Sequence, residues 1–132
     1  MPTTIRQQVT LPVTPKRLYQ LFLDAKEHAA FTDCPARISA KPGARFRVMD
    51  YITGRNLALS SGKQIIQSWR GDDWEATDPD SVLILNLRKV DAGVALEMIH
   101  AGVPEGHAKD LADGWKTFYW KPLRAYLTRP PR

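Results

Sequence analysis

The sequence predicts an α+β domain in which a curved antiparallel sheet of about six to seven strands packs on one long C-terminal helix. Three observations support this class: period-two alternation of apolar residues recurs along the chain, two helix-start signals follow the first alternating segment, and one long amphipathic pattern ends the sequence. The 132 residues, 43% hydrophobic and 25% charged, suit one globular core. We therefore expect residues 1–132 to form a single domain.

The first elements are a strand and two short helices. Alternation over Ile5–Leu11 predicts the strand. The pair Thr14-Pro15 is typical of an N-cap followed by proline in the first turn, and it predicts a helix over 15–23. The spacing Asp24-x-x-Glu27 resembles a capping box, so a second helix should run from there to about residue 31.

Strand signals dominate the middle of the chain. The tripeptide Lys41-Pro42-Gly43 suits a type II turn, because proline presets φ and glycine accepts a positive φ. The strands expected after it are Arg45–Tyr51, Thr53–Ser60, Lys63–Arg70, Val82–Val90 and Val94–Ala101. The last two should form a hairpin through Asp91-Ala92-Gly93.

The long helix is expected from His107 to about Leu127, with residues 129–132 as a frayed tail. At about 100° per residue, one stripe of apolar and aromatic side chains faces the sheet. Its members are Leu111, Trp115, Phe118, Tyr119, Pro122 and Tyr126. Because proline lacks an N–H, a kink is expected near 118–122.

The same angular count places Trp120 on the opposite, outward face of this helix. Lys116 and Arg124 lie four residues to either side of it, where their stems can cover the indole. Two interpretations stay open: a surface tryptophan shielded by its neighbours, or a contact surface for a partner.

Composition and motifs exclude several functions. The sequence contains no phosphate-binding loop, no zinc-binding helix, and only one cysteine, Cys34, which we expect to be an incidental thiol. We expect no metal and no cofactor. The net charge of +5, a single cysteine and no apolar membrane-length run favour a cytoplasmic chain with no integral membrane association. Nucleic-acid binding is disfavoured, because no aromatic–basic pattern runs along a strand.

Two groups of residues attract attention as candidate sites. Trp69 and Trp74 bracket a charged turn at a strand end, either as core filling or as cavity wall. His100 continues the apolar face formed by Val94, Leu96 and Met98, either as a hydrogen-bonded core or rim residue or as an acid/base group.

Several motifs resemble the START/SRPBCC (helix-grip) superfamily and, within it, the branch of activators of heat-shock-protein ATPase (Aha-like). They are His28-x-x-Phe31-Thr32, Pro42-Gly43-x-x-Phe46, Ile66-x-x-x-Trp69-Arg70-x-x-x-Trp74, His100-x-Gly102-Val103-Pro104 and Gly114-Trp115-x-x-Phe118-Tyr119-Trp120. The resemblance implies a curved sheet that grips the C-terminal helix around an apolar cavity. It also implies a heat-shock chaperone as an alternative partner, although the chain begins at the first helix-grip strand, and we therefore expect little ATPase stimulation by this chain alone.

The leading hypothesis is non-enzymatic binding of a small hydrophobic or aromatic ligand, lipid- or polyketide-like, by a monomer or weak dimer. The expected ligand-binding residues are Phe46, Trp69, Trp74, Met98, His100, Trp115, Phe118 and Tyr119, with Trp74 and His100 at the mouth or as polar groups. The first alternative is a co-chaperone-like module that uses Lys116, Trp120 and Arg124. The second is a cyclase- or hydrolase-type enzyme that uses His100.

Overall fold

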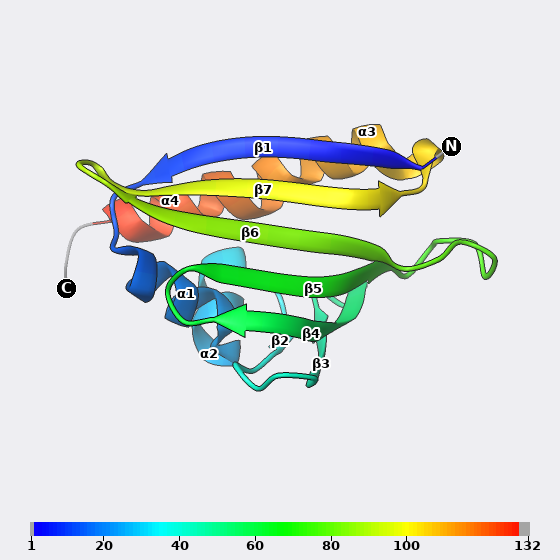
Figure 1. Ribbon diagram of the computed structural model, residues 1–132, viewed down its shortest axis with the longest axis horizontal. Coiled ribbons are helices and arrows are strands. Elements are labelled where there is room, and N and C mark those ends of the chain that lie inside the picture. The colour runs from blue at the N-terminus through cyan, green and yellow to red at the C-terminus, as the bar shows by residue number, and fades with distance from the viewer. Residues whose placement is uncertain (1, 130–132) are drawn as a thin grey trace.

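The computed structural model describes residues 2–129, and a seven-stranded antiparallel sheet is its main element. The strands are β1 (Thr3–Leu11), β2 (Ala36–Arg37), β3 (Arg45–Val48), β4 (Ile52–Ser60), β5 (Gln64–Gly71), β6 (Ser81–Val90) and β7 (Gly93–Val103). They lie in the order β1-β7-β6-β5-β4-β3-β2, so only β1 leaves the meander to pair with the last strand (Figure 1). The predicted α+β fold class is confirmed.

Two short helices, α1 (Pro15–Leu23) and α2 (Ala25–Thr32), follow β1 as expected. Thr14 accepts a hydrogen bond from the backbone N–H of Arg17, and Asp24 accepts one from Glu27, so both predicted caps are present. The Arg17 guanidinium also binds both oxygens of the Glu27 carboxylate, at 2.9 and 2.6 Å. That paired contact links the two helices on the solvent-exposed side.

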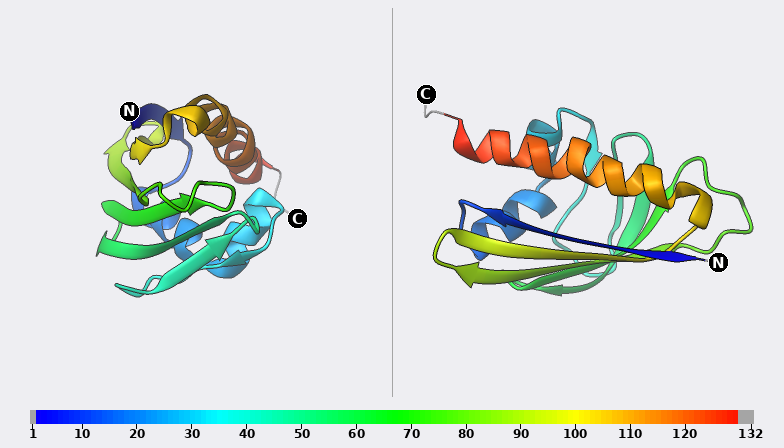
Figure 2. Two further views of the ribbon diagram at one scale, coloured as in Figure 1. Left: turned by 90° about the vertical axis from the view of Figure 1, so that its right-hand side faces the viewer. Right: turned by 90° about the horizontal axis from the view of Figure 1, so that it is seen from above.

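The long helix has three parts: α3 (Glu105–Gly114), a π-helical segment η1 (Trp115–Trp120) and α4 (Lys121–Thr128). It crosses the concave face of the sheet (Figure 2). The π pattern is an N–H that reaches the carbonyl five residues back, as the Lys121 N–H does to Lys116 at the end of η1. Where a kink was expected, near 118–122, the structure has a π segment that ends two residues before Pro122.

The π segment corrects two predicted side-chain positions. A π turn holds more residues than an α turn, so the angular count made at 100° per residue fails beyond Trp115. Trp120, predicted on the outer face, is buried and stacks on Trp115, with ring centroids 5.3 Å apart and planes at 17°. Phe118, predicted on the buried stripe, has 57% of its surface exposed.

The strand expected over 45–51 ends early. β3 stops at Val48, and Met49 and Asp50 both adopt positive φ, 59° and 49°, in a tight turn. The Tyr51 N–H donates to the Val48 carbonyl to close that turn. The type II turn at Lys41-Pro42-Gly43 is confirmed: Gly43 has a φ of 77°, and the Ala44 N–H donates to Lys41.

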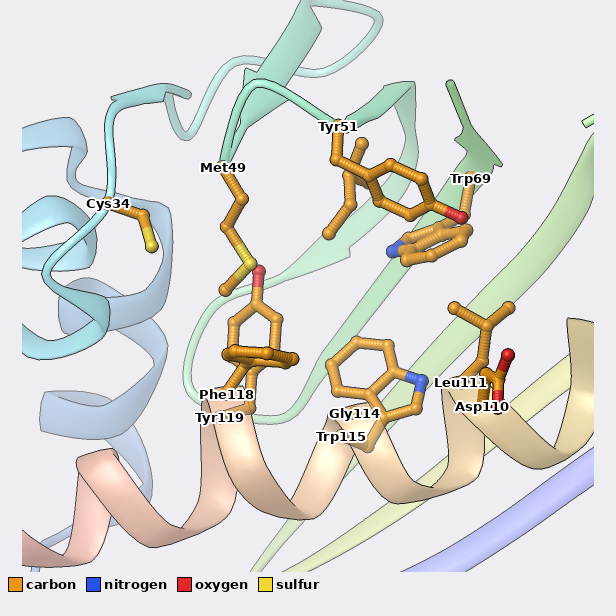
Figure 3. A pocket seen from close by; sticks show the side chains of 11 residues that line it. Cys34, Met49, Tyr51, Trp69, Asp110, Leu111, Gly114, Trp115, Phe118 and Tyr119 are labelled. Atoms are coloured by element: carbon orange, nitrogen blue, oxygen red, sulfur yellow. The ribbon is translucent and has the colours of Figure 1, made fainter. Parts of the chain in front are cut away.

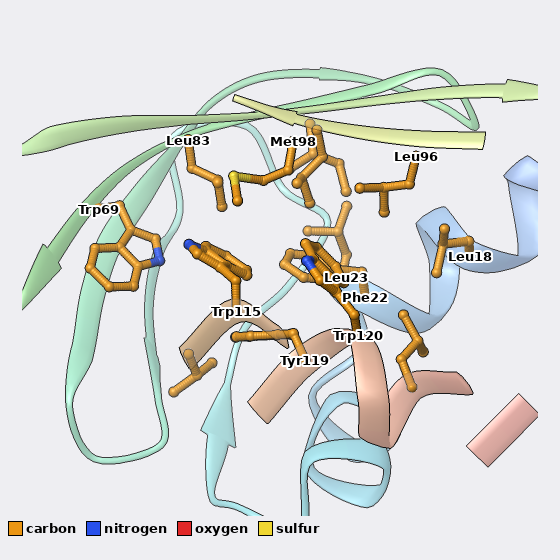
Figure 4. Packing of buried hydrophobic residues seen from close by; sticks show 14 of the residues in the cluster. Leu18, Phe22, Leu23, Trp69, Leu83, Leu96, Met98, Trp115, Tyr119 and Trp120 are labelled. Carbon is orange, nitrogen blue, oxygen red and sulfur yellow. The ribbon is translucent and has the colours of Figure 1, made fainter. Parts of the chain in front are cut away.

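The core lies between the sheet and the long helix, and it is closed at one end by α1 and α2 (Figure 4). Side chains such as Leu18, Met98 and Leu123 have 1% or less of their surface exposed. Of the predicted frayed tail, Arg129 lies with its guanidinium 4.4 Å from the centre of the Tyr126 ring. Residues 130–132 lie outside the described residues.

Candidate functional site

A cavity of about 390 Å³ opens between the long helix and the turn that follows β3 (Figure 3). The long helix supplies its floor, and β5 and the β3–β4 turn supply its roof. Its lining residues are Cys34, Met49, Tyr51, Ile52, Trp69, Asp110, Leu111, Gly114, Trp115, Phe118 and Tyr119. A volume of this size, lined mainly by apolar and aromatic side chains, is typical of a small-molecule site.

Aromatic rings form most of the cavity wall. Trp69 from β5 and Trp115 from η1 lie with ring centroids 6.2 Å apart, and Trp115 lies 4.7 Å from Tyr119. Tyr51 meets Trp69 edge-on at 6.5 Å. Phe118 lies exposed at the edge of the same space, so its position suits the mouth of the cavity.

The turn after β3 brings Met49 and Tyr51 to the cavity at a conformational cost. Two consecutive non-glycine residues with positive φ cost roughly 1–3 kcal/mol each. The Met49 N–H donates to the Pro35 carbonyl at 2.7 Å, which anchors the turn to the segment before β2. The Tyr51 hydroxyl donates to Asp73 at 2.6 Å; burial, and then this hydrogen bond, raise the pKa of Tyr51.

His100 was expected at the mouth or as a polar group of the cavity; it is completely buried and does not line the cavity. The Ser81 hydroxyl donates to the Trp69 carbonyl at 2.6 Å, so it must accept from His100 Nε2 at 2.8 Å. The Trp115 indole N–H donates to His100 Nδ1 at 3.2 Å. Both ring nitrogens are therefore engaged in one neutral tautomer, and burial lowers the pKa of His100 to about 3.

A second buried histidine, His28 of α2, fixes the other side of Tyr119. Its Nδ1 donates to the Phe22 carbonyl at 2.7 Å, so its Nε2 accepts from the Tyr119 hydroxyl at 2.9 Å. Burial lowers the pKa of His28 to about 4 and raises that of Tyr119. Tyr119 thus presents its ring to the cavity while its hydroxyl is held in the core.

The structure brings four of the eight predicted ligand-binding residues to the cavity: Trp69, Trp115, Phe118 and Tyr119. The other four do not line it. Phe46 packs against Gly54, where a Cβ would collide with its ring, and Met98 is fully buried in the core. Trp74 lies between Trp69, at 5.7 Å, and His107, at 5.9 Å.

Sequence reasoning missed several lining residues for two different reasons. Leu111 lies four residues before Trp115, and Gly114 lies four before Phe118, so helical spacing was a usable signal for both. Met49 and Tyr51 were assigned to a strand and Ile52 to the gap between two strands, and the turn that presents Met49 and Tyr51 contains neither glycine nor asparagine. Asp50, a residue type that tolerates positive φ, is the one local signal for that turn, and Met49 beside it gives none.

The structure does not contain the predicted partner surface of Lys116, Trp120 and Arg124. Trp120 is buried and donates its indole N–H to the Gln7 side-chain oxygen at 2.7 Å. Arg124 donates to the Thr10 carbonyl at 2.6 Å, which ties α4 to β1. Lys116 is exposed. The tryptophan expected at the centre of this surface belongs to the core.

The acidic loop between β5 and β6 is organised by Arg70. Its guanidinium donates to the backbone carbonyls of Glu75 and Asp78 and to the carboxylate of Asp80. Over residues 2–129 no group of three or more histidine, cysteine or acidic side chains is placed to hold a metal ion. None of the described helices is long and apolar enough to span a membrane.

A curved antiparallel sheet gripping a long helix, with an aromatic cavity between them, defines a helix-grip domain. Residues 12–128 match the family model described as "Activator of Hsp90 ATPase homolog 1-like protein", and the chain belongs to that family.

Known relatives agree with this assignment. The chain is 26% identical over 121 residues to an uncharacterized protein of Schizosaccharomyces pombe, covering 91% of this chain and 36% of that one. It is 25% identical over 116 residues to the human activator of 90 kDa heat shock protein ATPase homolog 1, covering 87% and 34%. The chain thus spans about a third of the length of these curated relatives.

The fold is also found in a solved structure, that of an HSP90 activator from Plasmodium falciparum. The TM-score is 0.85 at 20% identity, with 100% of this chain and 99% of that chain covered. At this level of identity the comparison supports the fold.

Proposed function

We propose that this protein binds a small hydrophobic or aromatic ligand in the cavity between β5, the β3–β4 turn and the long helix. The observation that carries the proposal is the space of about 390 Å³ that Trp69 and Trp115 border. Side chains that only filled a core would close such a space, because protein interiors are packed as densely as organic crystals. The strained turn at Met49 supports the same proposal, since strain of this kind gathers at ligand sites.

Binding without chemistry is the form of this function that the geometry favours. The enzymatic alternative relies on His100 as an acid or base, yet both nitrogens of that ring are already hydrogen-bonded. Its pKa near 3 keeps the imidazole neutral at physiological pH, and His100 is not among the residues that line the cavity. A general base needs a free nitrogen within reach of its substrate.

Tryptophan fluorescence tests the proposal directly. A ligand that enters the cavity contacts Trp69 and Trp115, so a panel of flat aromatic and aliphatic compounds should include some that shift or quench the emission with saturation. Trp115→Phe keeps apolar bulk and should remove much of that response. Trp74→Phe is the matched control, because Trp74 does not line the cavity. No saturable response from any compound, together with no co-purifying small molecule in native mass spectrometry, would refute ligand binding.

A second candidate function, a chaperone-interaction module, is favoured by the family and by one surface. Arg45 lies directly opposite Arg55, and Arg47 opposite Arg37, on the outer face of β2–β4. Like charges in such pairs destabilise a sheet. None of the four makes an ion pair with a described carboxylate. These four arginines repel one another across the sheet, and an acidic partner protein would offset that repulsion.

The two candidates separate in an ATPase assay with a 90-kDa heat-shock chaperone. If ligand binding is the function, this chain alone should stimulate turnover little. A saturable several-fold rise, lost in an Arg45→Glu/Arg55→Glu variant and retained in Lys116→Glu, would establish the chaperone module instead.

A further inference from the structure

The four indole N–H groups of this protein are not used alike. Trp115 donates to His100 and Trp120 donates to Gln7. Trp74 Nε1 is buried without an acceptor, and it lies outside the cavity lining. Trp69 is 3% exposed, and within residues 2–129 its side-chain N–H also has no acceptor. Unlike Trp74, it borders the cavity.

Figure 3 shows the direction of this free donor. The Trp69 nitrogen points into the space between Met49 and Tyr51 on one side and Trp115 and Phe118 on the other. The ring is fixed by its neighbours, with the His100 ring edge-on at 4.6 Å and Trp115 at 6.2 Å. The donor is therefore preorganised, and it cannot turn away to find another partner.

The remaining polar groups of the lining are already committed or carry negative charge. The Tyr51 hydroxyl donates to Asp73, and the Tyr119 hydroxyl donates to His28. Asp110, exposed at the rim, is the one charged side chain among the lining residues. A carboxylate near the mouth repels an anionic ligand at short range, and salt weakens this repulsion because the group is exposed.

We propose that the cavity selects flat, neutral aromatic ligands that carry a carbonyl-type oxygen, and that this oxygen accepts the hydrogen bond of Trp69 Nε1–H. The inference rests on the proposed ligand-binding function and names its ligand class. A ligand without an acceptor displaces solvent from the indole N–H and leaves it unpaired, which a hydrogen-bonding site penalises strongly. Anionic amphiphiles such as fatty acids are disfavoured by Asp110.

Isosteric probes test the hydrogen bond. Fluorenone and fluorene share a flat three-ring frame and differ by one carbonyl oxygen, so calorimetric titration of both isolates the acceptor. Fluorenone should bind about three- to tenfold more tightly, the range that one neutral hydrogen bond supplies. Trp69→Phe should abolish that preference, whereas Trp74→Phe should retain it.

A nuclear magnetic resonance measurement on the unmutated protein covers the case in which Trp69→Phe does not fold. With ¹⁵N-labelled indoles, fluorenone should shift the Trp69 Nε1–H proton downfield, and fluorene should not. A missing shift, equal binding of the two probes, or a preference that survives in Trp69→Phe would overturn the inference and leave ligand binding intact. Failure of every aromatic probe to bind would instead overturn the proposed function itself.

A second pair of probes tests whether the negative charge of Asp110 disfavours anionic ligands. 1-Acetylnaphthalene is neutral and 1-naphthoate is anionic at pH 7, with the same ring and a similar side group. The ketone should bind several-fold more tightly, and Asp110→Asn should narrow the difference. Equal affinities, or a gap that Asp110→Asn does not change, would remove Asp110 and its charge from the selection.

Discussion

The two ends of the long helix meet the rest of the protein in different ways. At the α4 end, Leu123 is completely buried, and Tyr119 is held by His28 from α2. At the α3 end no residue of the helix is buried, and Leu111 faces the cavity. One end of the same element thus serves stability, and the other leaves space for a ligand.

Matched leucine substitutions give the largest expected difference between the ends. Leu123→Ala should lower the free energy of unfolding by about 2–5 kcal/mol, because it opens a new void in a packed region. Leu111→Ala should cost about 1 kcal/mol or less, since its side chain already borders empty space. Urea denaturation of both variants measures the difference. Equal losses would mean that the cavity is closed in solution and that the two ends are packed alike.

The same contrast explains what the sequence could and could not predict. The packed framework follows from local signals: the Thr14 and Asp24 caps set α1 and α2, and alternation sets the strands. The cavity does not follow from such signals. Its roof depends on a left-handed turn at Met49 with no glycine, and its floor depends on a π segment that exchanges the predicted places of Phe118 and Trp120.

The most instructive of these failures concerns which residues of the long helix face the core. Burial of Trp115, Tyr119 and Trp120 on one face requires spacings of four and five residues, which an α-helix cannot align. Packing of two indoles in a stack, with each N–H bonded to a different strand, outweighs the poorer backbone geometry of the π turn. Tertiary contacts decide which residues of this helix face the core. The periodicity of the helix sequence alone does not contain those contacts.

The π segment of the helix is also fastened to two neutral histidines, through Trp115 to His100 and through Tyr119 to His28, and this predicts acid sensitivity. The folded pKa values, about 4 for His28 and about 3 for His100, lie below the unfolded value of 6.5. Below pH 6.5 the unfolded chain therefore binds protons that the folded chain does not, and stability falls as the pH falls. The loss is about 1.4 kcal/mol per pH unit for each histidine, so about 2 kcal/mol each at pH 5.

Denaturation at pH 7.5 and pH 5 with His28→Gln and His100→Gln separates the two contributions from those of the carboxylates. Each variant should lose less stability than the parent protein on acidification. An unchanged pH dependence in either variant would show that the corresponding imidazole is not held neutral by the fold.

The smallest expected effect concerns Cys34, a partly exposed residue of the cavity lining. Serine has nearly the same size, so Cys34→Ser should change the free energy of unfolding by about 0.5 kcal/mol or less and ligand affinity by about twofold or less. The thiol is then useful as a reporter, because a bound ligand should cover the sulfur and slow its reaction with an aromatic disulfide reagent. Slowing by fluorenone in the parent protein, with unchanged binding in Cys34→Ser, would place the ligand beside a thiol that takes no part in holding it. Complete loss of binding in Cys34→Ser would instead make the sulfur a required contact and extend the selective part of the site from Trp69 to the segment before β2.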